Sequence, residues 1–245
     1  MPFQHATPDH DPCILEGVQP LLAELKEPIH TRVLDQGHPE RAVVQAFIHR
    51  VFALRFRADV QSFYPTLLSF RDAQRQRAAV GMRDGQGGRL FAEQYLGAAA
   101  EQLIGERLGR TIARENLVEV GNLALESPGD TRWAIAASTL FLHALGYRWV
   151  LFTATRTLIN AFQRLGLQPL PLAAARPLLL DDRGEHWGDY YQAGPVVCAG
   201  DIDSGYQKLR RHVGHNQPLL RALLSDMDRQ AARVTGAASS CCGGE

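Results

Sequence analysis

The sequence predicts an α/β (α+β) fold built around one strand–helix–strand–helix unit at residues 117–166. Two apolar stretches, LVEVGNLAL at 117–125 and RWVLFTAT at 148–155, have the pattern of strands that are covered on both faces, which suits parallel pairing. The apolar helix predicted between them, at 131–145, is long enough to return the chain to a parallel neighbour. A further helix is predicted to follow the second strand and to end at 165–166.

Glycines and capping residues define the details of this unit. Gly121 inside the first strand predicts a bulge or a close backbone approach, and a bulge there would splay the two strands and open a slot between them. Asp130 or Thr131 is expected to cap the helix at 131–145, and Gly146 fits the left-handed residue after its last turn. The start of that helix then offers backbone N–H groups to a phosphate.

The first third of the chain contains one well-defined predicted helix. Residues 1–37 are poorly patterned and are interpreted as an arm, with a short helix at 14–25 that Pro20 interrupts. A helix is predicted from His38 to about 58–59, because its apolar residues recur at helical spacing. These residues are Val43, Val44, Phe47, Ile48, Val51, Phe52 and Leu54. The arginines Arg41, Arg50, Arg55 and Arg57 are expected on the other faces of this helix.

Shorter elements fill the rest of the chain. Before the central unit, the sequence predicts two strands at 66–71 and 77–83, separated by a turn at 72–76 and followed by a turn at 84–88. A short strand or strand end at 90–95 and a helix at 98–109 come next. Predicted after the central unit are an edge strand at 168–172, an aromatic turn or short helix at 187–191, a last strand at 195–202, and amphipathic helices at 204–212 and 218–233. We therefore expect an arm (1–37), one domain (38–203), C-terminal helices (204–234) and a disordered tail (235–245).

Composition excludes several classes of function. The formal net charge is zero, which argues against a dedicated nucleic-acid-binding protein. The four cysteines lack zinc-site or CxxC spacing, so we expect a reduced, cytoplasmic protein. No secretory signal and no apolar run of ~18 residues is visible, so no transmembrane segment is expected. The histidines show no HExxH spacing and no GxSxG is present, so neither a metal nor a lipase-type nucleophile is expected.

Five stretches, in order and spacing, resemble the family named thermostable hemolysin. They are FYPTLLSFRD at 63–72, AAVGMRD at 78–84, LFAEQYL at 90–96, VEVGNLA at 118–124 and RWVLFTATRTLINAFQRLGL at 148–167. The likeness covers roughly residues 41–202. The kinked strand, turn, helix, strand and helix ending in RLGL also resemble the core of GNAT-type N-acyltransferases and, more distantly, acyl-homoserine-lactone synthases. This resemblance implies a GNAT-like three-layer fold, with a central mixed, strongly twisted sheet flanked by helices.

The resemblance implies an N-acyltransferase that moves a fatty acyl group from a thioester to a small amine acceptor. The donor would be acyl-CoA or an acyl-phosphopantetheine on acyl-carrier protein. The usual Gln/Arg-x-x-Gly-x-Gly/Ala pyrophosphate loop of GNAT enzymes is absent, so a carrier-protein donor fits at least as well as coenzyme A. Phe162 occupies the position where many GNAT enzymes have a tyrosine as general acid. That acid is dispensable, because a thiol with a pKa of about 8.5 leaves readily as thiolate.

Three residues are candidates for the chemistry. Glu119 and Asn122 flank Gly121, and a carboxylate facing the slot can take a proton from an attacking amine, directly or through a water. Acyl-homoserine-lactone synthases carry Glu-x-x-Arg on the equivalent strand, whereas this chain has Glu-x-x-Asn. A structural pairing of Glu119 with an arginine is the alternative. Glu93 would hydrogen-bond the acceptor, or else lie on a solvated strand edge.

Other residues are candidates for binding the donor and the acceptor. Those assigned to the donor border the slot or lie at the carboxyl edge of the sheet, where ligands gather in open α/β folds. They are Val120, Gly121, Leu123, Thr131, Arg132, Thr153, Arg156 and Asn160. The residues assigned to the acceptor or the acyl chain are Arg71, Arg83, Tyr95 and Trp187. Surface salt bridges for the arginines and ordinary packing for the aromatic residues remain the alternatives.

Two other functions are weighed against the acyltransferase. The family name suggests a membrane-damaging protein, acting directly or through a surface-active lipid product, although no long amphipathic hairpin and no strongly hydrophobic helix supports direct lysis. The other is a catalytically inactive GNAT fold used for binding. The basic residues of the C-terminal helices, such as Arg210 and Arg211, form a solvated face or a docking surface for acidic carrier protein or anionic membrane.

Overall fold

A seven-stranded sheet forms the centre of the molecule, and its two parallel strands lie near the middle. The computed structural model describes residues 25–212 and 217–241, and the strand order is β1-β2-β3-β4-β5-β7-β6. β4 and β5 are parallel, and every other neighbouring pair in this sheet is antiparallel. The strands are β1 (His30–Leu34), β2 (Thr66–Arg71), β3 (Gln76–Asp84), β4 (Leu117–Leu125), β5 (Trp149–Ala154), β6 (Leu170–Ala174) and β7 (Val196–Asp201).

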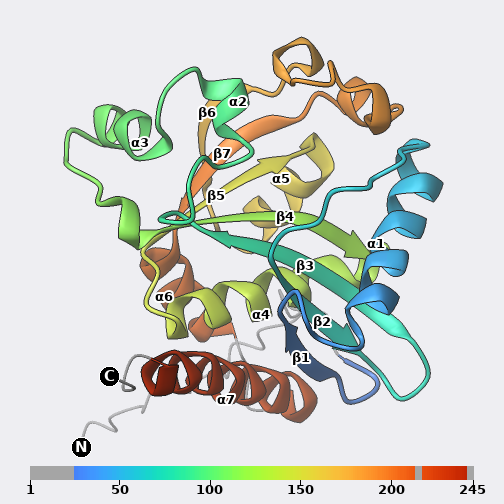
Figure 1. Cartoon of the computed structure of the whole chain (residues 1–245). Helices are drawn as coiled ribbons and strands as arrows, with labels where there is room; N and C mark the ends of the chain where they lie inside the picture. The colour runs from blue at the N-terminus through green and yellow to red at the C-terminus, as the bar shows by residue number, and fades with distance from the viewer. Residues whose placement is uncertain (1–24, 213–216, 242–245) are drawn as a thin grey trace, which may run out of the picture.

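Helices cover both faces of this mixed sheet, which gives the predicted α/β architecture (Figure 1). The helices are α1 (Arg41–Phe56), α2 (Glu93–Leu96), α3 (Ala100–Leu108), α4 (Thr131–Ala144), α5 (Arg156–Arg164), α6 (Ile202–His212) and α7 (Pro218–Cys241). α4, α6 and α7 share one core with Val80 and Val118 of the sheet. On the other face, α1 packs on Leu67 and Ala79, while α3 packs beside Leu117.

The predicted unit at 117–166 is present as β4, α4, β5 and α5. The parallel pairing of β4 with β5 is confirmed. Gly146 follows α4 with φ 89°, and Gly166 follows α5 with φ 72°, so both helices end at a left-handed glycine. The predicted edge strand is also confirmed, because β6 with Pro171 lies at one end of the strand order.

The start of α4 differs from the prediction. Ser127 is the capping residue, and it caps a 3₁₀ turn, η2 (Pro128–Asp130), that precedes the helix. The Gly129 N–H donates to Ser127 Oγ at 3.3 Å, and the Ser127 N–H donates to the Asp130 carboxylate at 3.2 Å. Asp130 is buried and forms an ion pair with Arg77 at 2.5 Å. This carboxylate therefore stabilises the turn and the neighbouring strand, and neither Asp130 nor Thr131 caps α4 through its side chain.

The predicted strand at 90–95 is wrong. This segment is a turn that leads into α2, and Gly97 ends α2 in the left-handed conformation with φ 69°. Its backbone N–H groups bind carboxylates instead of a neighbouring strand: Leu90 donates to Glu93 at 2.8 Å, and Phe91 donates to Glu119 at 2.8 Å. An apolar run as short as this does not distinguish strand from helix by itself, so the two carboxylates decide its conformation.

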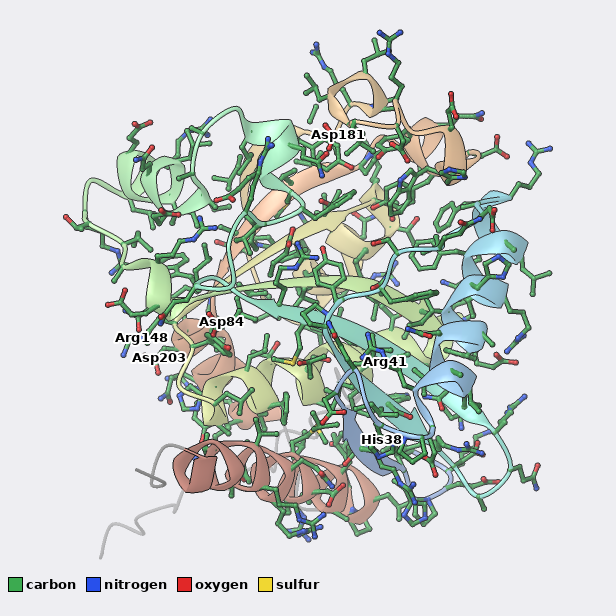
Figure 2. The ribbon with its side chains drawn as sticks, in the orientation of Figure 1. His38, Arg41, Asp84, Arg148, Asp181 and Asp203 are labelled. Atoms are coloured by element: carbon green, nitrogen blue, oxygen red, sulfur yellow. The ribbon has the colours of Figure 1, made fainter. Side chains whose placement is uncertain are left out.

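The apolar face of α1 is narrower than predicted. Val43 and Leu54 are 57% and 75% exposed, although they lie at helical spacing with the buried residues. Arg41, in contrast, is buried and faces inward between α1 and β2 (Figure 2). Its guanidinium donates to the carbonyl oxygens of Tyr64 at 2.5 Å and Pro65 at 2.8 Å. Because these carbonyls lack strand partners, the arginine is the group that satisfies them.

Both ends of the described chain join the main fold. β1 lies within the region interpreted as an arm and pairs with β2 along its whole length. α7 continues to Cys241, which makes it longer than the predicted helix and extends it into the predicted disordered tail. The helix expected at 14–25 lies almost entirely outside the described residues. Each predicted C-terminal helix is present, because α6 and α7 correspond to the expected helices at 204–212 and 218–233.

Candidate active site

β4 and β5 separate near the middle of the sheet. Their parallel pairing runs from Leu117 and Trp149 to Val120 and Phe152, but β4 continues to Leu125 and β5 to Ala154. Beyond this point β4 and β5 are no longer paired with each other. β4 stays paired with β3, and β5 stays paired with β7. This divergence lies where the slot was predicted, and it begins next to Gly121.

A bulge in β4 accompanies the divergence. Ala79 pairs with Ala124 and Gly81 pairs with Gly121, so the two residues Asn122 and Leu123 lie opposite Val80 alone. Asn122 has φ 48°, a conformation that asparagine tolerates better than most residues. Its side chain fixes the preceding loop, because Oδ1 accepts the Tyr64 N–H at 3.0 Å and Nδ2 donates to the Ser62 carbonyl at 3.3 Å. Asn122 therefore shapes the site through the backbone.

The bulge resets the alternation of side chains along β4. Val120 and Leu123 both pack on the core that contains α4, although they are three residues apart, while Ala124 packs on the α1 side. Val120, Gly121, Leu123 and Thr153 are only half-buried, despite their central place in the sheet. No residue of α5, which follows β5, is fully buried. Half-buried positions therefore occur at the divergence next to fully buried ones such as Ala124 and Ala154.

Glu119 is buried at the entrance to this region, with 1% of its surface exposed. Its two carboxylate oxygens accept the backbone N–H groups of Phe91 at 2.8 Å and Ala92 at 2.6 Å. Burial raises the pKa of the Glu119 carboxyl above its usual range, although these N–H groups, Arg83 and the Tyr64 hydroxyl act in the opposite direction. A carboxylate whose pKa is raised is a stronger proton acceptor than an exposed one.

Tyr64 is the residue of this site that the sequence analysis missed. It lies near the end of the loop between α1 and β2, and burial together with the nearby Glu119 charge raises the pKa of its hydroxyl well above the usual value. Its ring lies against the backbone of Gly121, because a Cβ atom added to that glycine would stand 2.5 Å from the ring. The signal in the sequence was a pair of glycines, Gly81 and Gly121, on two adjacent strands; glycines that face each other leave room for an aromatic ring.

Glu93 has a structural environment. It is buried, and its carboxylate forms an ion pair with Arg114 while accepting the N–H groups of Leu90 at 2.8 Å and Ala100 at 2.9 Å. Burial favours the neutral acid, but the hydrogen bonds with Arg114, Ala100 and Leu90 outweigh it and lower the pKa of Glu93. This carboxylate holds the turn at 90–100 in place, which is the turn that binds Glu119.

The structure separates the two predicted substrate-binding arginines. Arg83 is the register partner of Glu119, and its guanidinium lies 5.2 Å from the centre of the Tyr64 ring. Arg71 ends β2 and pairs in register with Gln76, at the opposite end of β3 from Arg83. Only Arg83 therefore belongs to the site around Glu119.

The two aromatic residues predicted to bind substrate, Tyr95 and Trp187, belong to a packed aromatic cluster. Tyr95 is buried, with its hydroxyl 2.7 Å from that of Tyr191. The Trp187 ring lies 5.9 Å from Phe91 and 5.3 Å from Tyr190, between centroids, and it joins the α1 core to the α3 core. Both predicted residues lie on the same face of the sheet as Glu119.

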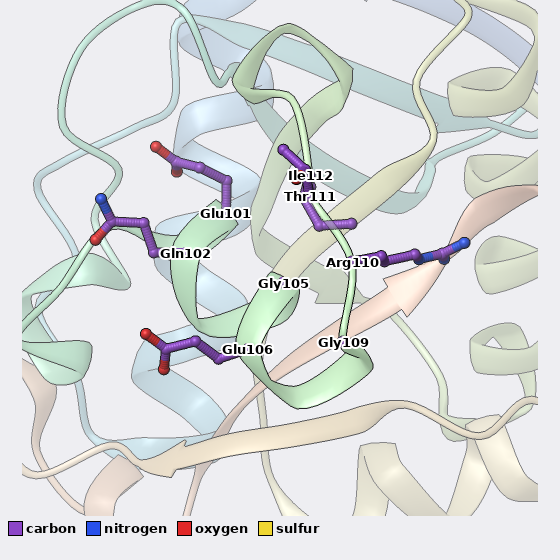
Figure 3. Close-up of a pocket in the computed structure, with 8 residues that line it drawn as sticks. All are labelled: Glu101, Gln102, Gly105, Glu106, Gly109, Arg110, Thr111 and Ile112. Atoms are coloured by element: carbon purple, nitrogen blue, oxygen red, sulfur yellow. The ribbon is translucent and has the colours of Figure 1, made fainter.

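The remaining predicted donor residues lie at the carboxyl ends of β4 and β5. Thr131 and Arg132 begin α4, Arg156 begins α5, and Arg156 and Asn160 are exposed. The anion closest to the start of α4 is the protein's own Asp130, which belongs to the capping box described above. Two surface hollows lie elsewhere: one follows α3 and residues 109–112 (Figure 3), and the other is bordered by turns at 85–89 and 97–101. Neither is lined by Glu119.

The sequence matches one family over most of its length. The model of the family described as "Thermostable hemolysin" matches residues 34–206. The chain belongs to the thermostable hemolysin family. No curated protein matches this family member with statistical significance.

Three solved structures that share the fold of this hemolysin-family chain are synthases of acylated small molecules. LasI, an acyl-homoserine-lactone synthase, has a TM-score of 0.52 at 12% identity, covering 78% of this chain and 99% of LasI. FeeM, an N-acyl amino acid synthase from uncultured soil microbes, has a TM-score of 0.51 at 12% identity, covering 74% and 95%. BjaI, a CoA-dependent acyl-homoserine-lactone synthase solved with SAM and isopentyl-CoA, has a TM-score of 0.51 at 14% identity, covering 80% and 98%. At these identities the likeness establishes the fold.

Among residues 25–212 and 217–241 of this thermostable hemolysin family member, no group of three or more His, Cys, Asp or Glu side chains is placed to hold a metal ion. Within the same part of the chain, no helix combines the length and the apolar character needed to span a bilayer.

Proposed function

We propose that this chain is an N-acyltransferase that moves a fatty acyl group from a thioester to a small amine. The observation that carries the proposal is the separation of β4 from β5 after Val120 and Phe152, next to a buried carboxylate. Backbone groups of β4 beyond this point have no register partner on β5. They are the polar groups that an extended acyl-pantetheine arm would bind, because it carries amides of its own.

The donor would be acyl-CoA or an acyl-phosphopantetheine on carrier protein. Val120, Gly121, Leu123 and Thr153 would contact the pantetheine arm, since they are the half-buried residues at the divergence. Arg132, Arg156 and Asn160 lie at the carboxyl edge, where a phosphate would arrive. The fold neighbour BjaI was solved with isopentyl-CoA, which supports a donor of this chemical class.

The reaction would need one proton acceptor. The amine nitrogen attacks the thioester carbonyl carbon, its proton passes to Glu119 directly or through a water, and the C–S bond breaks to release a thiolate and an amide. The raised pKa of Glu119 suits this role, because a more basic carboxylate is a better proton acceptor. Arg83, which faces Glu119 across the strands, would bind a carboxylate or phosphate group of the acceptor.

The test is formation of an amide from a defined donor. Purified protein is incubated with a long-chain acyl-CoA or acyl-carrier protein and a panel of amines, and the products are identified by mass spectrometry. Glu119→Gln should reduce the rate about 10²–10⁴-fold, the usual contribution of a general base. Because the amide of Gln would oppose one of the N–H groups of Phe91 and Ala92, its circular dichroism and thermal unfolding must match those of the wild type.

A second variant tests the slot without touching the carboxylate. Thr153→Trp places a large ring at the divergence and should reduce the rate about 10²-fold, because a displaced donor loses its reactive geometry. The matched control is Thr111→Trp, on the rim of the hollow in Figure 3, which should leave the rate unchanged. Equal losses in both variants, or lysis of red cells by purified protein without any acyl donor, would contradict the proposal.

A further inference from the structure

Tyr64 occupies a position that the backbone defines closely. Its side chain lies across two register partners, with its Cβ next to Gly81 on β3 and its ring next to Gly121 on β4. A Cβ atom on Gly121 would stand 2.7 Å from the Tyr64 hydroxyl oxygen, and one on Gly81 would stand 2.9 Å from the Tyr64 Cβ. Any side chain at either position would therefore push the tyrosine away, and two glycines create the space that the ring fills.

The backbone N–H and carbonyl groups of Tyr64 are both hydrogen-bonded to buried side chains. Its N–H donates to Asn122 Oδ1 at 3.0 Å, and its carbonyl oxygen accepts Arg41 Nη2 at 2.5 Å. Asn122 is part of the β4 bulge, and Arg41 begins α1. The bulge thus holds the backbone of Tyr64, while Gly121 beside it supports the ring. This arrangement directs the hydroxyl toward Glu119.

Two backbone N–H groups, those of Phe91 and Ala92, donate to the Glu119 carboxylate. The Tyr64 hydroxyl lies on the same side of β4 as Glu119, because it stands 2.7 Å from where a Cβ atom of Gly121 would lie and residues two apart on a strand share a face. The charged or titratable side chains around this pair are Arg83 from β3, Tyr95 from α2 and Tyr190 from the turn at 190–193. Of these side chains and Tyr64 itself, Tyr64 is the one that belongs to the loop after α1.

We infer that Tyr64 is a positioning residue for Glu119: its hydroxyl donates to the carboxylate and, together with the N–H groups of Phe91 and Ala92, fixes the orientation of that carboxylate. The inference rests on the proposed function only in treating Glu119 as the base. Tyr64 keeps its own proton, because burial first and then the nearby Glu119 charge raise its pKa well above the usual value. A hydroxyl that stays protonated is a permanent donor, and donation to the charged form of a carboxyl lowers the pKa of that carboxyl.

The test is the titration of Glu119 in the Tyr64→Phe variant. This change keeps the ring on the two glycines and removes only the hydroxyl. Glu119 is followed by the infrared carbonyl band of its protonated form, identified as the band that Glu119→Gln lacks. We expect its midpoint to rise by about one pH unit when the hydrogen bond is lost. Tyr206→Phe, which removes a hydroxyl bonded to Arg210 on α6, should leave the midpoint unchanged.

Gly121→Ala provides an independent change of the same contact. The added methyl group would stand 2.5 Å from the ring of Tyr64, so the ring must move and the midpoint of Glu119 should rise as in Tyr64→Phe. Gly37→Ala is the control, because its methyl group would meet only ordinary van der Waals contact, at 3.7 Å from Asp35. A midpoint that stays at the wild-type value in Tyr64→Phe overturns the inference.

The infrared titration also separates this inference from the proposed function. In a working enzyme, the acid limb of the pH–rate profile moves to higher pH in Tyr64→Phe, because Glu119 must lose its proton before it can accept another. If the midpoint moves while no amide forms under any condition, the role of Tyr64 stands and the proposed function fails. If amide forms and the midpoint does not move, the proposed function stands and the role of Tyr64 fails.

Discussion

At the scale of single residues, two buried glutamates show how the same side chain acquires different chemistry. Glu93 faces Arg114 and accepts two backbone N–H groups, and its pKa is lowered because these contacts outweigh burial. Glu119 also accepts two backbone N–H groups, but burial dominates and its pKa is raised. An arginine in direct contact is the difference between them. Glu93 is therefore suited to stabilising the structure, whereas Glu119 is suited to accepting a proton.

Glu93→Gln should destabilise the protein in a pH-dependent way. The folded state holds Glu93 with a lowered pKa, so its stabilising contribution is present above the unfolded pKa and is lost as the pH falls through the folded pKa. We expect the variant to lose about 3 kcal/mol of unfolding free energy at pH 7, since a buried, paired charge loses its counterpart. Urea unfolding at several pH values measures this difference.

The control for that prediction is Glu106→Gln, an exposed glutamate on α3. It should change the unfolding free energy by no more than about 0.5 kcal/mol at any pH. A loss in Glu93→Gln that stays constant from pH 7 to pH 3 would show that the carboxylate charge is not the stabilising feature.

The sequence predicted only some of the polar residues that contact one another in the folded protein. Glu119 and Gly121 were identified because a carboxylate and a glycine interrupt an apolar strand. Tyr64 was not, since it precedes Glu119 by a long stretch of chain and its place depends on the register that sets Gly81 against Gly121. Arg114, the partner of Glu93, was missed for the same reason. Tertiary contacts of this kind leave no periodic signal.

At the scale of elements, the bulge in β4 is the feature that shapes the site. It shifts the alternation so that Val120 and Leu123 share a face, and it lies where β4 leaves β5. Asn122 adopts φ 48° there and binds the loop at 62–64 through its side chain. A bulge bends its strand and increases the local twist, and the divergence that the proposed function requires begins at this point.

Replacing Asn122 should separate the backbone effect from the hydrogen bonds. Asn122→Gly keeps the left-handed conformation accessible but loses two hydrogen bonds, for a cost of about 1–3 kcal/mol in unfolding free energy. Asn122→Ala loses the same bonds and must also adopt an unfavourable φ, which adds about 1 kcal/mol. The Asn122→Ala variant should therefore have a lower unfolding free energy than the Asn122→Gly variant, which is the reverse of the usual order in strands. Urea unfolding of both variants measures this order, and a more stable alanine variant would show that the bulge relaxes.

The elements themselves were predictable where long apolar runs end at glycines. β4, α4, β5 and α5 follow this rule, with Gly146 and Gly166 as the terminating residues. The segment at 90–95 was misjudged because its conformation depends on carboxylates from Glu93 and Glu119 rather than on its own pattern. β1 was missed because it is only five residues long and lies in a poorly patterned region.

At the scale of the whole molecule, β1 near the start of the described chain is hydrogen-bonded to α7 at its end. The Thr31 hydroxyl on β1 donates to Asp226 on α7, and Gln230 Nε2 donates to the Thr31 carbonyl oxygen at 3.2 Å. α7 also buries Leu223 and Met227 in the same core as Trp133 of α4. The sequence analysis treated the C-terminal helices as a separate unit, because a helix of alternating polar and apolar residues does not reveal what its apolar face covers. The packing instead makes α7 a part of the central core.

This packing predicts that the described fold unfolds as one unit. Met227 has none of its surface exposed, so Met227→Ala should cost about 2–5 kcal/mol of unfolding free energy through lost burial and a residual cavity. Because α7 shares a core with β1 and α4, the loss should shift a single transition that tryptophan fluorescence and circular dichroism report together. Leu178→Ala, at a side chain that is 77% exposed, should change the unfolding free energy by at most about 0.5 kcal/mol. Two separate transitions, with only the weaker one affected by Met227→Ala, would mean that α7 forms an independent unit resting on the sheet.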